Sequence, residues 1–288
     1  MKMSETGIII KGIAGFYYVK SGDALYRCKA RGIFKEQGVR LATGDRVTVE
    51  VAEEGSDSLI TELHPRKNSF IRPFVTNVDC FVVVTAVRKP APVPRITDRF
   101  LVMAEQAGTD IVLCINKCDL ADPEKLAEIY SPIYPVVCTD GVSGRGIDRL
   151  MELIRGKVTA LAGPSGVGKS TIINRLVPGA AMETGEISSK SGRGRHTTRH
   201  SEIFDLEDGL GTMIFDTPGF TSFTGENIPE EELQRYYPEI FEHSQGCRYD
   251  NCRHIAEPGC AVKEALSCGD ISESRYESYR SHMEEIRK

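Results

Sequence analysis

The sequence has 288 residues, of which 40% are apolar and 27% are charged, as is typical of a soluble globular protein. This length favours two or three domains over one small domain. Lys and Arg total 36 and Asp and Glu total 41, giving a net charge of −5. The acidic balance disfavours a general nucleic-acid binder, although a local basic face can still bind RNA.

Cysteine usage and the chain start indicate the compartment. Nine cysteines are present, and four of them crowd between Cys247 and Cys268, which favours a reduced compartment over a secreted disulfide framework. The start MKMSETGIIIKGIAGF lacks the long apolar core of a signal peptide. The apolar run CFVVVTAV (80–87) is much shorter than the roughly 20 residues of a membrane helix. We expect a cytoplasmic, soluble monomer that binds no membrane.

Residues 1–68 have a β-rich pattern. The stretches GIIIKGIAGFYYV, ALYRCKARG and DRVTVEVAE are rich in Ile, Val and Tyr, and Gly and Asp separate them. Short strands at this spacing predict a small barrel, although any all-β adaptor has the same pattern.

From about residue 69 the predicted strands alternate with helices. Strands are expected in FVVVTAV, DIVLCINK, KVTALAG and GTMIFD, and helices in PEKLAEIY and KSTIINRL. A further helix is expected in TDRFLVMAEQAG, with Thr97 as its N-cap and Gly108 at its end. This alternation predicts a doubly wound parallel sheet over residues 69–225. Helices are expected again in EELQRYYPEI and ISESRYESYRSHMEEIRK, within residues 226–288.

The stretch GPSGVGKS (163–170) fits the phosphate-loop pattern G-x-x-x-x-G-K-[ST] and lies between a predicted strand and a predicted helix. Its backbone N–H groups and the helix N-terminus are expected to hold phosphates. Lys169 is expected to reach the β- and γ-phosphates, and the Ser170 hydroxyl to ligate Mg²⁺. The predicted phosphate-binding residues are Gly163, Pro164, Ser165, Gly166, Val167, Gly168, Lys169, Ser170 and Thr171.

The stretch NKCD (116–119) follows a predicted strand and is typical of a guanine site. The Asp119 carboxylate can accept from both N1–H and the N2 amino group of guanine, a donor pair that adenine lacks. Asn116 is expected to bond the base edge and brace the site, and the aliphatic stem of Lys117 to lie over the ring. With the phosphate loop, this motif predicts a site for GTP and GDP.

The stretch DTPG (216–219) follows the strand GTMIF downstream of the phosphate loop. Asp216 is placed to hold Mg²⁺ through water, and Gly219 to bond the γ-phosphate with its N–H. The motif is therefore expected to sense hydrolysis of the nucleotide.

The motif order, with NKCD before GPSGVGKS and DTPG last, is that of circularly permuted GTPases. The stretches GFYYV, YRCKARG and TGDRV also resemble an OB-fold domain, and the whole chain resembles the ribosome small subunit-dependent GTPase A family. The resemblance implies an OB-fold domain (1–68), a circularly permuted GTPase domain (69–225) and a helical zinc-binding domain (226–288). It also implies binding to the small (30S) ribosomal subunit and its 16S rRNA, a role in late maturation, and GTP hydrolysis stimulated by the subunit.

The resemblance further implies that GEISSKSGRGRHTTRH (185–200) is the first switch. Thr197 or Thr198 would complete the Mg²⁺ shell, and Thr198 is slightly favoured. Phe220 stands where many GTPases place a water-orienting glutamine, so intrinsic hydrolysis should be slow. His196 is then a candidate general base or water-positioning group, and with Thr198 and Lys169 it completes the predicted catalytic set; alternatively His196 contacts only RNA phosphate or solvent.

Other parts of the chain are candidates for RNA and guanine contact. The basic residues near the switch favour contact with RNA phosphate over a solvated loop; they are Lys190, Arg193, Arg195 and Arg199. Three aromatic residues of the barrel are candidate platforms for base stacking, although strand alternation is expected to bury at least one of them; they are Phe16, Tyr17 and Tyr18. The region CTDGVSGRGIDRL (138–150) lacks the Ser-Ala pair that often touches guanine O6, so backbone amides are expected to serve there.

The stretch CRYDNCRHIAEPGC contains four potential metal ligands, Cys247, Cys252, His254 and Cys260, at C-x4-C-x-H-x5-C spacing. Three thiolates and one imidazole complete a tetrahedral Zn²⁺ shell, which leaves no open position and predicts a structural site. The alternative is a set of reduced surface cysteines. Cys268 and His243 lie outside the pattern.

Two other functions remain open from the sequence. One is an RNA-binding adaptor whose bound guanine nucleotide is mainly structural, an alternative that Phe220 favours. The other is an ATP-dependent kinase on a phosphate-loop fold, which requires NKCD to be accidental.

Overall fold

The computed structural model describes residues 3–53, 55–177, 201–216, 220 and 228–288. The chain divides into two compact units, one formed by residues 1–80, 154–161 and 170–220, the other by 81–153, 162–169 and 221–288. The two boundaries between the three domains expected from the sequence stay a prediction.

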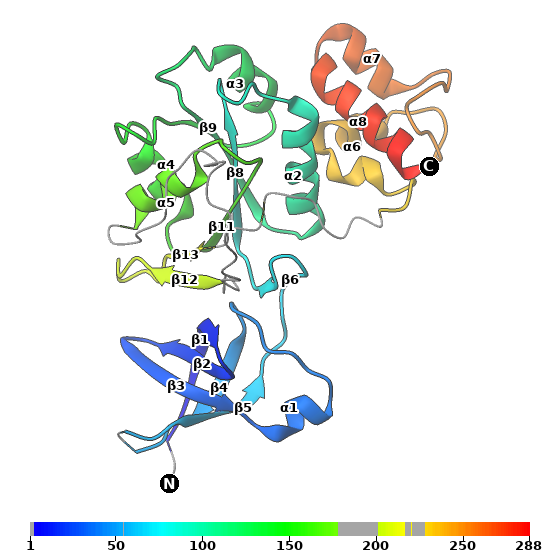
Figure 1. The fold of residues 1–288 in the computed structure, drawn as a ribbon. Helices are drawn as coiled ribbons and strands as arrows, with labels where there is room; N and C mark the ends of the chain where they lie inside the picture. The colour runs from blue at the N-terminus through cyan, green and yellow to red at the C-terminus, as the bar shows by residue number, and fades with distance from the viewer. Residues whose placement is uncertain (1–2, 54, 178–200, 217–219, 221–227) are drawn as a thin grey trace, which may run out of the picture. The chain divides into compact units, whose positions relative to one another are not determined.

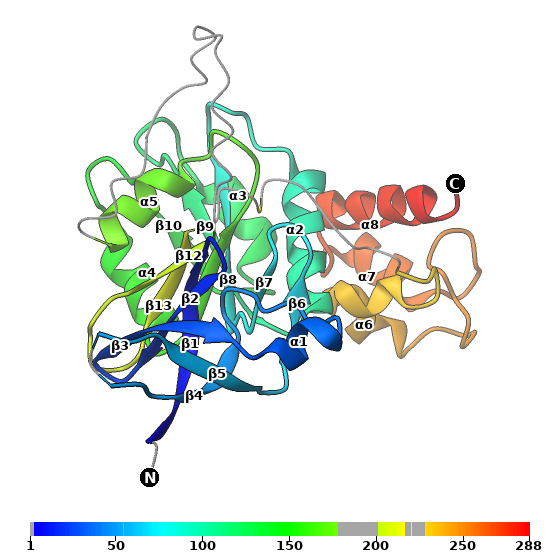
Figure 2. The ribbon, with the colours of Figure 1, turned by 60° about the horizontal axis from the view of Figure 1, so that its bottom comes forward.

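The first unit begins with a closed five-stranded barrel (Figures 1 and 2). The strand order β1-β2-β3-β5-β4 returns to β1 because the first half of β1 pairs with β4 and its second half with β2. This is the connectivity of an OB fold, and the predicted barrel is confirmed. The elements are β1 (Ser4–Ile13), β2 (Phe16–Ser21), β3 (Ala24–Ala30), α1 (Gly32–Glu36), β4 (Arg46–Glu50) and β5 (Ser58–Leu63).

Alternating side chains of these strands fill the barrel. Ile9, Val19, Val47 and Ile60 are almost completely buried and form one apolar cluster with Cys28. Successive strand residues point to opposite faces, so their neighbours in sequence face outward. Phe16, Tyr17 and Tyr18 are all only partly buried, so the expected burial of one of them in the core is wrong, although Tyr17 packs against this cluster.

A fully buried carboxylate joins the barrel to the hairpin of β6 (Ser69–Phe70) and β7 (Val75–Thr76). Asp45 accepts hydrogen bonds from the Ala42 N–H (2.7 Å), Arg66 Nε (2.7 Å) and Thr76 Oγ1 (2.8 Å). A Cβ on Gly44 would lie 2.1 Å from the Thr76 carbonyl oxygen, so the two segments pass each other at backbone distance. A paired buried charge of this kind fixes geometry, because losing one partner is costly.

The same unit contains one side of the nucleotide-binding domain. β11 (Val158–Ala162) lies parallel to β13 (Met213–Asp216), and β12 (Glu202–Asp205) is antiparallel to β13. α5 (Lys169–Leu176) follows β11. β12 also pairs with β1 of the barrel, where Lys11 and Glu202 form an ion pair of 2.7 Å.

The second unit contains the strands β8 (Cys80–Ala86), β9 (Asp110–Asn116) and β10 (Val136–Cys138), with β9 in the middle and β10 parallel to it. Every residue of β8 is buried, which confirms the interpretation of its apolar run. The helices here are α2 (Pro94–Gln106), α3 (Glu124–Tyr130) and α4 (Ile147–Ile154).

The predicted N-cap of α2 is wrong. The helix begins at Pro94 with Val93 as its N-cap, and Thr97 is buried inside the helix. Proline suits the first helical turn because its missing N–H would have no partner there. The signal for an N-terminal proline was present in the sequence and was stronger than that of the threonine.

The C-terminal region is helical, as predicted, and packs on α2 (Figure 1). It consists of the 3-10 helix η1 (Leu233–Tyr236), α6 (Pro238–Ser244), α7 (Ala261–Cys268) and α8 (Glu273–Ile286). Pro238 divides the predicted EELQRYYPEI helix into η1 and α6, since a proline starts a helix better than it continues one.

A buried ion pair network holds these helices on α2. The Arg275 guanidinium of α8 is completely buried and donates to Asp98 of α2 (2.7 Å) and to both oxygens of Glu239 of α6 (2.7 and 3.1 Å). Within the part of the chain that the structure describes, no helix has the length and apolarity to cross a membrane.

Candidate nucleotide site and metal centre

The Asn116 side chain is the centre of the predicted guanine site. It lies at the carboxyl end of β9 and is 2% exposed. Its Nδ2 donates to the Val167 carbonyl (2.8 Å), and its Oδ1 accepts from Thr139 Oγ1 (3.0 Å) and the Gly141 N–H (3.0 Å). One amide thus joins NKCD to the phosphate loop and to the segment after β10, as its predicted bracing role requires.

Lys117 also reaches the phosphate loop. Its Nζ donates to the carbonyl of Gly166 (2.6 Å) and to that of Lys89. Asp119 is exposed to solvent. Its carboxylate is therefore accessible to an incoming base, whereas Asn116 and Lys117 hold the walls of the site.

The phosphate loop has the shape that its glycines permit. Gly163 has φ +141°, and a Cβ there would lie 2.2 Å from the Val84 carbonyl oxygen; a Cβ on Gly168 would lie 2.3 Å from Asn116 Nδ2. Side chains at either position would displace the loop from β8 and from Asn116. The loop conformation therefore depends on these two glycines.

Lys169 points its amino group back into this loop. Nζ donates to the carbonyls of Gly163 (2.6 Å) and Pro164 (2.8 Å), and burial lowers the pKa of Lys169 to about 8. A nucleotide phosphate would give this ammonium a charged partner and favour the protonated form. The chemistry of the donor set therefore fits a phosphate chain.

The remaining predicted nucleotide residues belong to the first unit. Ser170 and Thr171 are partly buried in the first turn of α5, and Asp216 is partly buried at the carboxyl end of β13. These are the places expected of Mg²⁺ ligands in phosphate-loop proteins. His196, Thr197, Thr198, Gly219 and the basic residues 190–199 lie outside the described residues.

Phe220, the residue after DTPG, is completely buried. Its ring meets that of Phe70 edge to face, with centroids 5.5 Å apart and an interplanar angle of 84°. A phenyl ring cannot orient water by hydrogen bonding, and here it is part of an apolar contact with β6. The side chain therefore anchors the chain after DTPG rather than serving the reaction.

The four predicted zinc ligands come together in the C-terminal region. The sulfur atoms of Cys247, Cys252 and Cys260 and one ring nitrogen of His254 lie within 4.8 Å of one another. Nδ1 of His254 is 3.5 Å from Cys247 Sγ and 3.4 Å from Cys260 Sγ, and these two sulfurs are 3.9 Å apart. A tetrahedral Zn²⁺ with ordinary bond lengths requires separations of about 3.6 Å for S···N and about 3.8 Å for S···S. The separations among Cys247, His254 and Cys260 match these values, and Cys252 Sγ lies within 4.8 Å of the other ligand atoms, so the residues present fit a zinc site.

The protonation chemistry of the cluster points the same way. Burial lowers the pKa of His254, so the ring is neutral as a metal ligand must be. Burial raises the pKa of Cys252 to about 12, so a thiolate at this position requires a neighbouring cation such as Zn²⁺.

Gln234 is a supporting residue that the sequence did not reveal. Its Oε1 lies 2.7 Å from His254 Nε2, and the backbone carbonyl of His254 accepts from the Tyr276 hydroxyl (2.6 Å). A hydrogen bond to Nε2–H leaves Nδ1 as the unprotonated nitrogen that faces the sulfurs. Neither Gln234 nor Thr139, which bonds Asn116, belongs to a motif, so only the folded geometry identifies them.

Together the fold and the site define a phosphate-loop guanine nucleotide protein in which the guanine motif precedes the phosphate loop. The family described as "RsgA GTPase" matches residues 63–226, and "RsgA N-terminal domain" matches residues 6–60. The chain belongs to the RsgA GTPase family, which confirms the resemblance and the predicted circularly permuted GTPase.

Several relatives match over nearly their whole length. The "Small ribosomal subunit biogenesis GTPase RsgA" of Carboxydothermus hydrogenoformans is 47% identical over 97% of both chains, and that of Agathobacter rectalis is 46% identical over 98% of both. The crystal structure of YjeQ from Thermotoga maritima has a TM-score of 0.86 at 34% identity and covers 99% of both chains. That of YloQ, described as a circularly permuted GTPase, has a TM-score of 0.81 at 33% identity, covering 99% of this chain and 96% of that one.

Proposed function

We propose that this GTPase binds the small ribosomal subunit through its 16S rRNA, acts in the subunit's late maturation, and hydrolyses GTP faster when bound there. The observation that carries the proposal is the Asn116 network, which joins a guanine-selecting motif to a phosphate loop. The relatives' role in small subunit biogenesis supports the choice of partner. This work would take place in the cytoplasm, with the protein as a monomer.

The proposed roles follow the sequence motifs. Asp119 selects guanine, Lys169 neutralises phosphate charge, and Ser170 with Asp216 and Thr198 or Thr197 would hold Mg²⁺. When bound, Mg²⁺ supplies further neutralisation of the phosphates. Gly219 would contact the γ-phosphate.

Phe220 supports the dependence on a partner. Because its ring is buried against Phe70, the residue after DTPG offers no group that could position water. We infer that His196 takes this role when the subunit is bound. The same observation favours the second candidate, an RNA-binding adaptor in which hydrolysis is incidental.

The decisive experiment measures GTP hydrolysis alone, with small subunits and with large subunits as the control. Stimulation by small subunits only, lost in His196→Ala with GTP binding retained, is the expected result. A flat response despite tight GTP binding would establish the adaptor instead.

Coupling of nucleotide to partner has its own test. Affinity for the small subunit should differ between the protein with GDP and the protein with a non-hydrolysable GTP analogue. A GTPase that dissociates from the subunit after hydrolysis must bind the subunit with different affinity in its GTP and GDP states. Equal affinities would contradict the coupling.

A further inference from the structure

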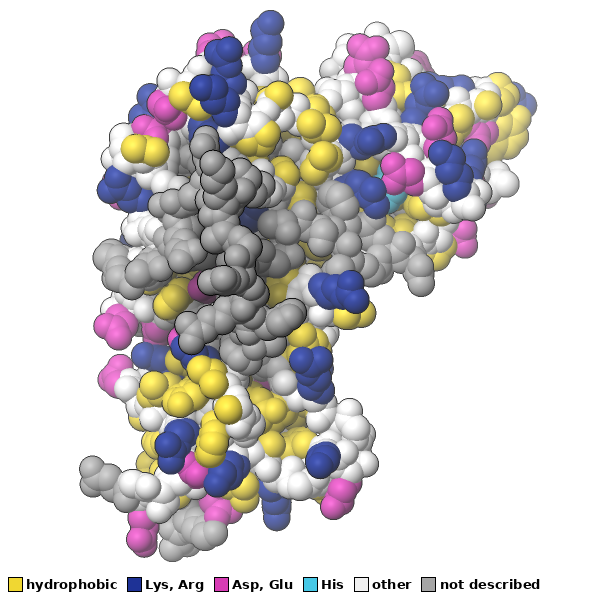
Figure 3. Space-filling model, in the orientation of Figure 1, with side chains coloured by type: hydrophobic (Ala, Val, Ile, Leu, Met, Phe, Trp, Pro, Cys, Tyr) yellow, Lys and Arg dark blue, Asp and Glu magenta, His cyan; other side chains and the backbone are white. Residues whose placement is uncertain are grey.

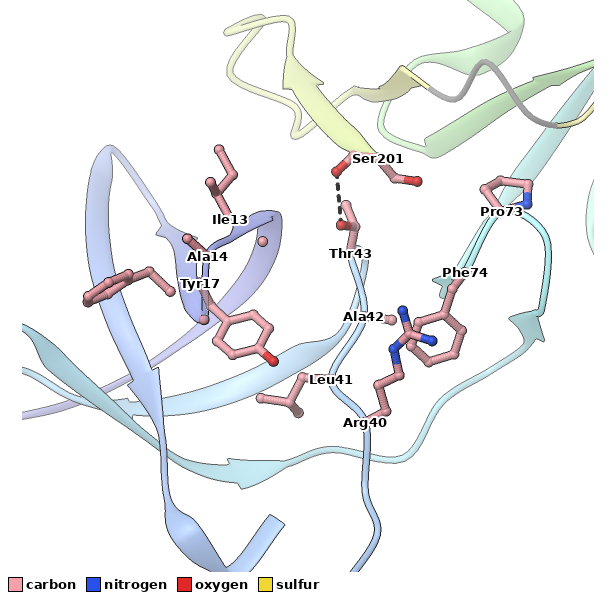
Figure 4. A pocket seen from close by; sticks show the side chains of 13 residues that line it. Ile13, Ala14, Tyr17, Arg40, Leu41, Ala42, Thr43, Pro73, Phe74 and Ser201 are labelled. Carbon is pink, nitrogen blue, oxygen red and sulfur yellow. Dashed lines mark hydrogen bonds between the residues drawn. The ribbon is translucent and has the colours of Figure 1, made fainter. Parts of the chain in front are cut away.

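A pocket of about 390 Å³ lies in the first compact unit (Figure 4). Four segments form its wall: the turn between β1 and β2 with its flanks, the loop 40–43 before β4, Pro73–Phe74 of the β6–β7 hairpin, and Ser201 before β12. This volume is that of a small-molecule or single-nucleotide site.

The pocket wall holds two phenyl rings, and each ring has two cations beside it. The guanidinium carbons of Arg40 and Arg66 lie 4.6 and 5.6 Å from the centroid of Phe74. Arg27 and Lys29 lie 5.3 and 5.2 Å from the centroid of Phe16. Figure 4 shows the Arg40 side chain against the Phe74 ring. The repeated pairing of ring and cation defines the chemistry of the site.

The charge of this region is positive. Asp45 pairs with Arg66, and Asp57 pairs with Arg27 (2.5 Å) and Lys29 (3.0 Å), which leaves four cations against two carboxylates. No Asp or Glu lines the pocket, and within the described residues no carboxylate pairs with Arg40. In Figure 3 the barrel's surface shows Lys and Arg side chains among hydrophobic ones. Such a surface fits a ligand that has both a flat ring and phosphates.

We propose that this pocket binds one unstacked nucleotide of a single-stranded RNA, with the base against Phe74 and the backbone phosphates beside Arg40 and the Phe16 cations. Aromatic platforms with flanking cations are how proteins hold single strands, because every base has a flat face and every phosphate a charge. The proposal deepens the proposed function, on which its choice of RNA rests. The cations are divided between two rings and exceed the carboxylates by two, which fits successive phosphates of a strand better than the single phosphate of a mononucleotide.

The pocket is also tied to the segment that leads into β12. Thr43 Oγ1 donates to the Ser201 carbonyl (3.1 Å), and both residues line the wall. RNA held here would therefore contact the nucleotide-binding domain at β12 as well as the barrel.

The test uses the full-length protein and a short fluorescein-labelled single-stranded RNA, followed by anisotropy. Arg40→Gln and Phe74→Leu should each weaken binding about tenfold, within the range for loss of a stacked base. Arg46→Gln and Tyr26→Leu are the matched controls, because they remove the same charge and the same kind of ring from barrel positions outside the pocket. The controls should bind within about twofold of the parent protein.

A second measurement keeps the result independent of folding defects. A 2-aminopurine in the strand should lose fluorescence on binding the parent protein and the controls, but not Phe74→Leu at saturating protein, because stacking quenches it. Competition by AMP equal to that by the strand would assign the pocket to free nucleotides and overturn the RNA proposal.

Other results would also overturn it. Equal losses of RNA affinity in Arg40→Gln and Arg46→Gln, with no loss in Phe74→Leu, would mean that binding is a general attraction between charges. Binding of duplex RNA as tight as that of the single strand would exclude an unstacked base. If the pocket instead binds a protein segment, Arg40→Gln and Phe74→Leu would leave the affinity for RNA unchanged. If small subunits stimulate GTP hydrolysis while the pocket variants bind RNA normally, the pocket proposal fails and the proposed function stands. If the pocket variants lose RNA binding but small subunits do not stimulate GTP hydrolysis by the parent protein, the pocket proposal stands and the proposed function fails.

Discussion

Lys169 makes the affinity for guanine nucleotide depend on pH in a way that can be calculated. In the free protein, burial lowers its pKa to about 8, while among the described residues its amino group bonds the neutral carbonyls of Gly163 and Pro164. Bound phosphates favour the charged form and raise the pKa again. Between these two pKa values the complex holds one more proton than the free protein, so affinity falls as pH rises through about 8.

The size of the effect follows from the fraction of free protein that is already protonated. At pH 9 this fraction is about one in eleven, and at pH 7 about nine in ten, for a pKa near 8. Affinity for GDP should therefore drop about tenfold between pH 7 and 9, or about 1.4 kcal/mol. Folding stability should move the other way and rise above pH 8, because the unfolded lysine binds its proton up to a pKa of about 10.4.

The assay is titration with a fluorescent GDP analogue across this pH range, with Lys169→Arg as the control. A guanidinium stays charged throughout, so any decline in the arginine variant belongs to other groups, such as the guanine ring itself. Calorimetry in buffers of different ionisation enthalpy should show uptake of nearly one proton on binding at pH 9. Equal pH profiles for lysine and arginine, or no proton uptake, would refute the reasoning.

The other predictions concern three further contacts. Asp119→Asn removes a charged acceptor pair and should weaken GDP binding about 10- to 100-fold while improving binding of xanthosine diphosphate, whose C2 carbonyl can accept from the amide; unchanged GDP affinity would exclude NKCD as the guanine reader. Gln234→Leu should lower zinc affinity about 10- to 100-fold, measured by competition with a chromogenic chelator, with Gln234→Glu as the variant that keeps the acceptor. Arg275→Met leaves two buried carboxylates unpaired and should cost about 3–5 kcal/mol in urea unfolding, with partial recovery at low pH as Asp98, whose pKa burial raises, becomes protonated; a loss below about 1 kcal/mol would show that water reaches the network.

The sequence was most informative where chemistry requires one residue type at one spacing. NKCD, GPSGVGKS and the Cys247, Cys252, His254 and Cys260 spacing each constrain several positions at once, because a base edge, a phosphate chain and a tetrahedral metal have fixed geometry. The structure places the zinc residues together and joins the first two motifs through Asn116. The five-strand barrel was also predictable, since short alternating strands close most simply into a barrel.

What the sequence did not reveal depends on long-range packing. Gln234 and Arg275 are ordinary polar residues in their local sequence, and their roles arise only when η1 meets the metal loop and α8 meets α2. A buried arginine is unexpected on composition alone, because charged side chains are almost never buried without partners. Its partners, Asp98 and Glu239, lie 177 and 36 positions away, beyond any periodic pattern.

Phe220 shows how a local sequence observation acquires meaning from its surroundings. From the sequence it is only a missing glutamine, whereas in the structure it is an apolar anchor on Phe70 at the last residue of the first compact unit. The next described residue, Ile228, is buried in the core of the C-terminal helices in the second unit. Burial therefore holds Phe220 within the first unit and Ile228 within the second. In a protein with the usual motif order this segment would continue into the guanine-reading half, but here the permutation connects it to the zinc-binding region. The permutation thus makes the zinc-binding region the next part of the chain after DTPG, and under the coupling proposed above a change at DTPG would reach that region rather than the guanine-reading half.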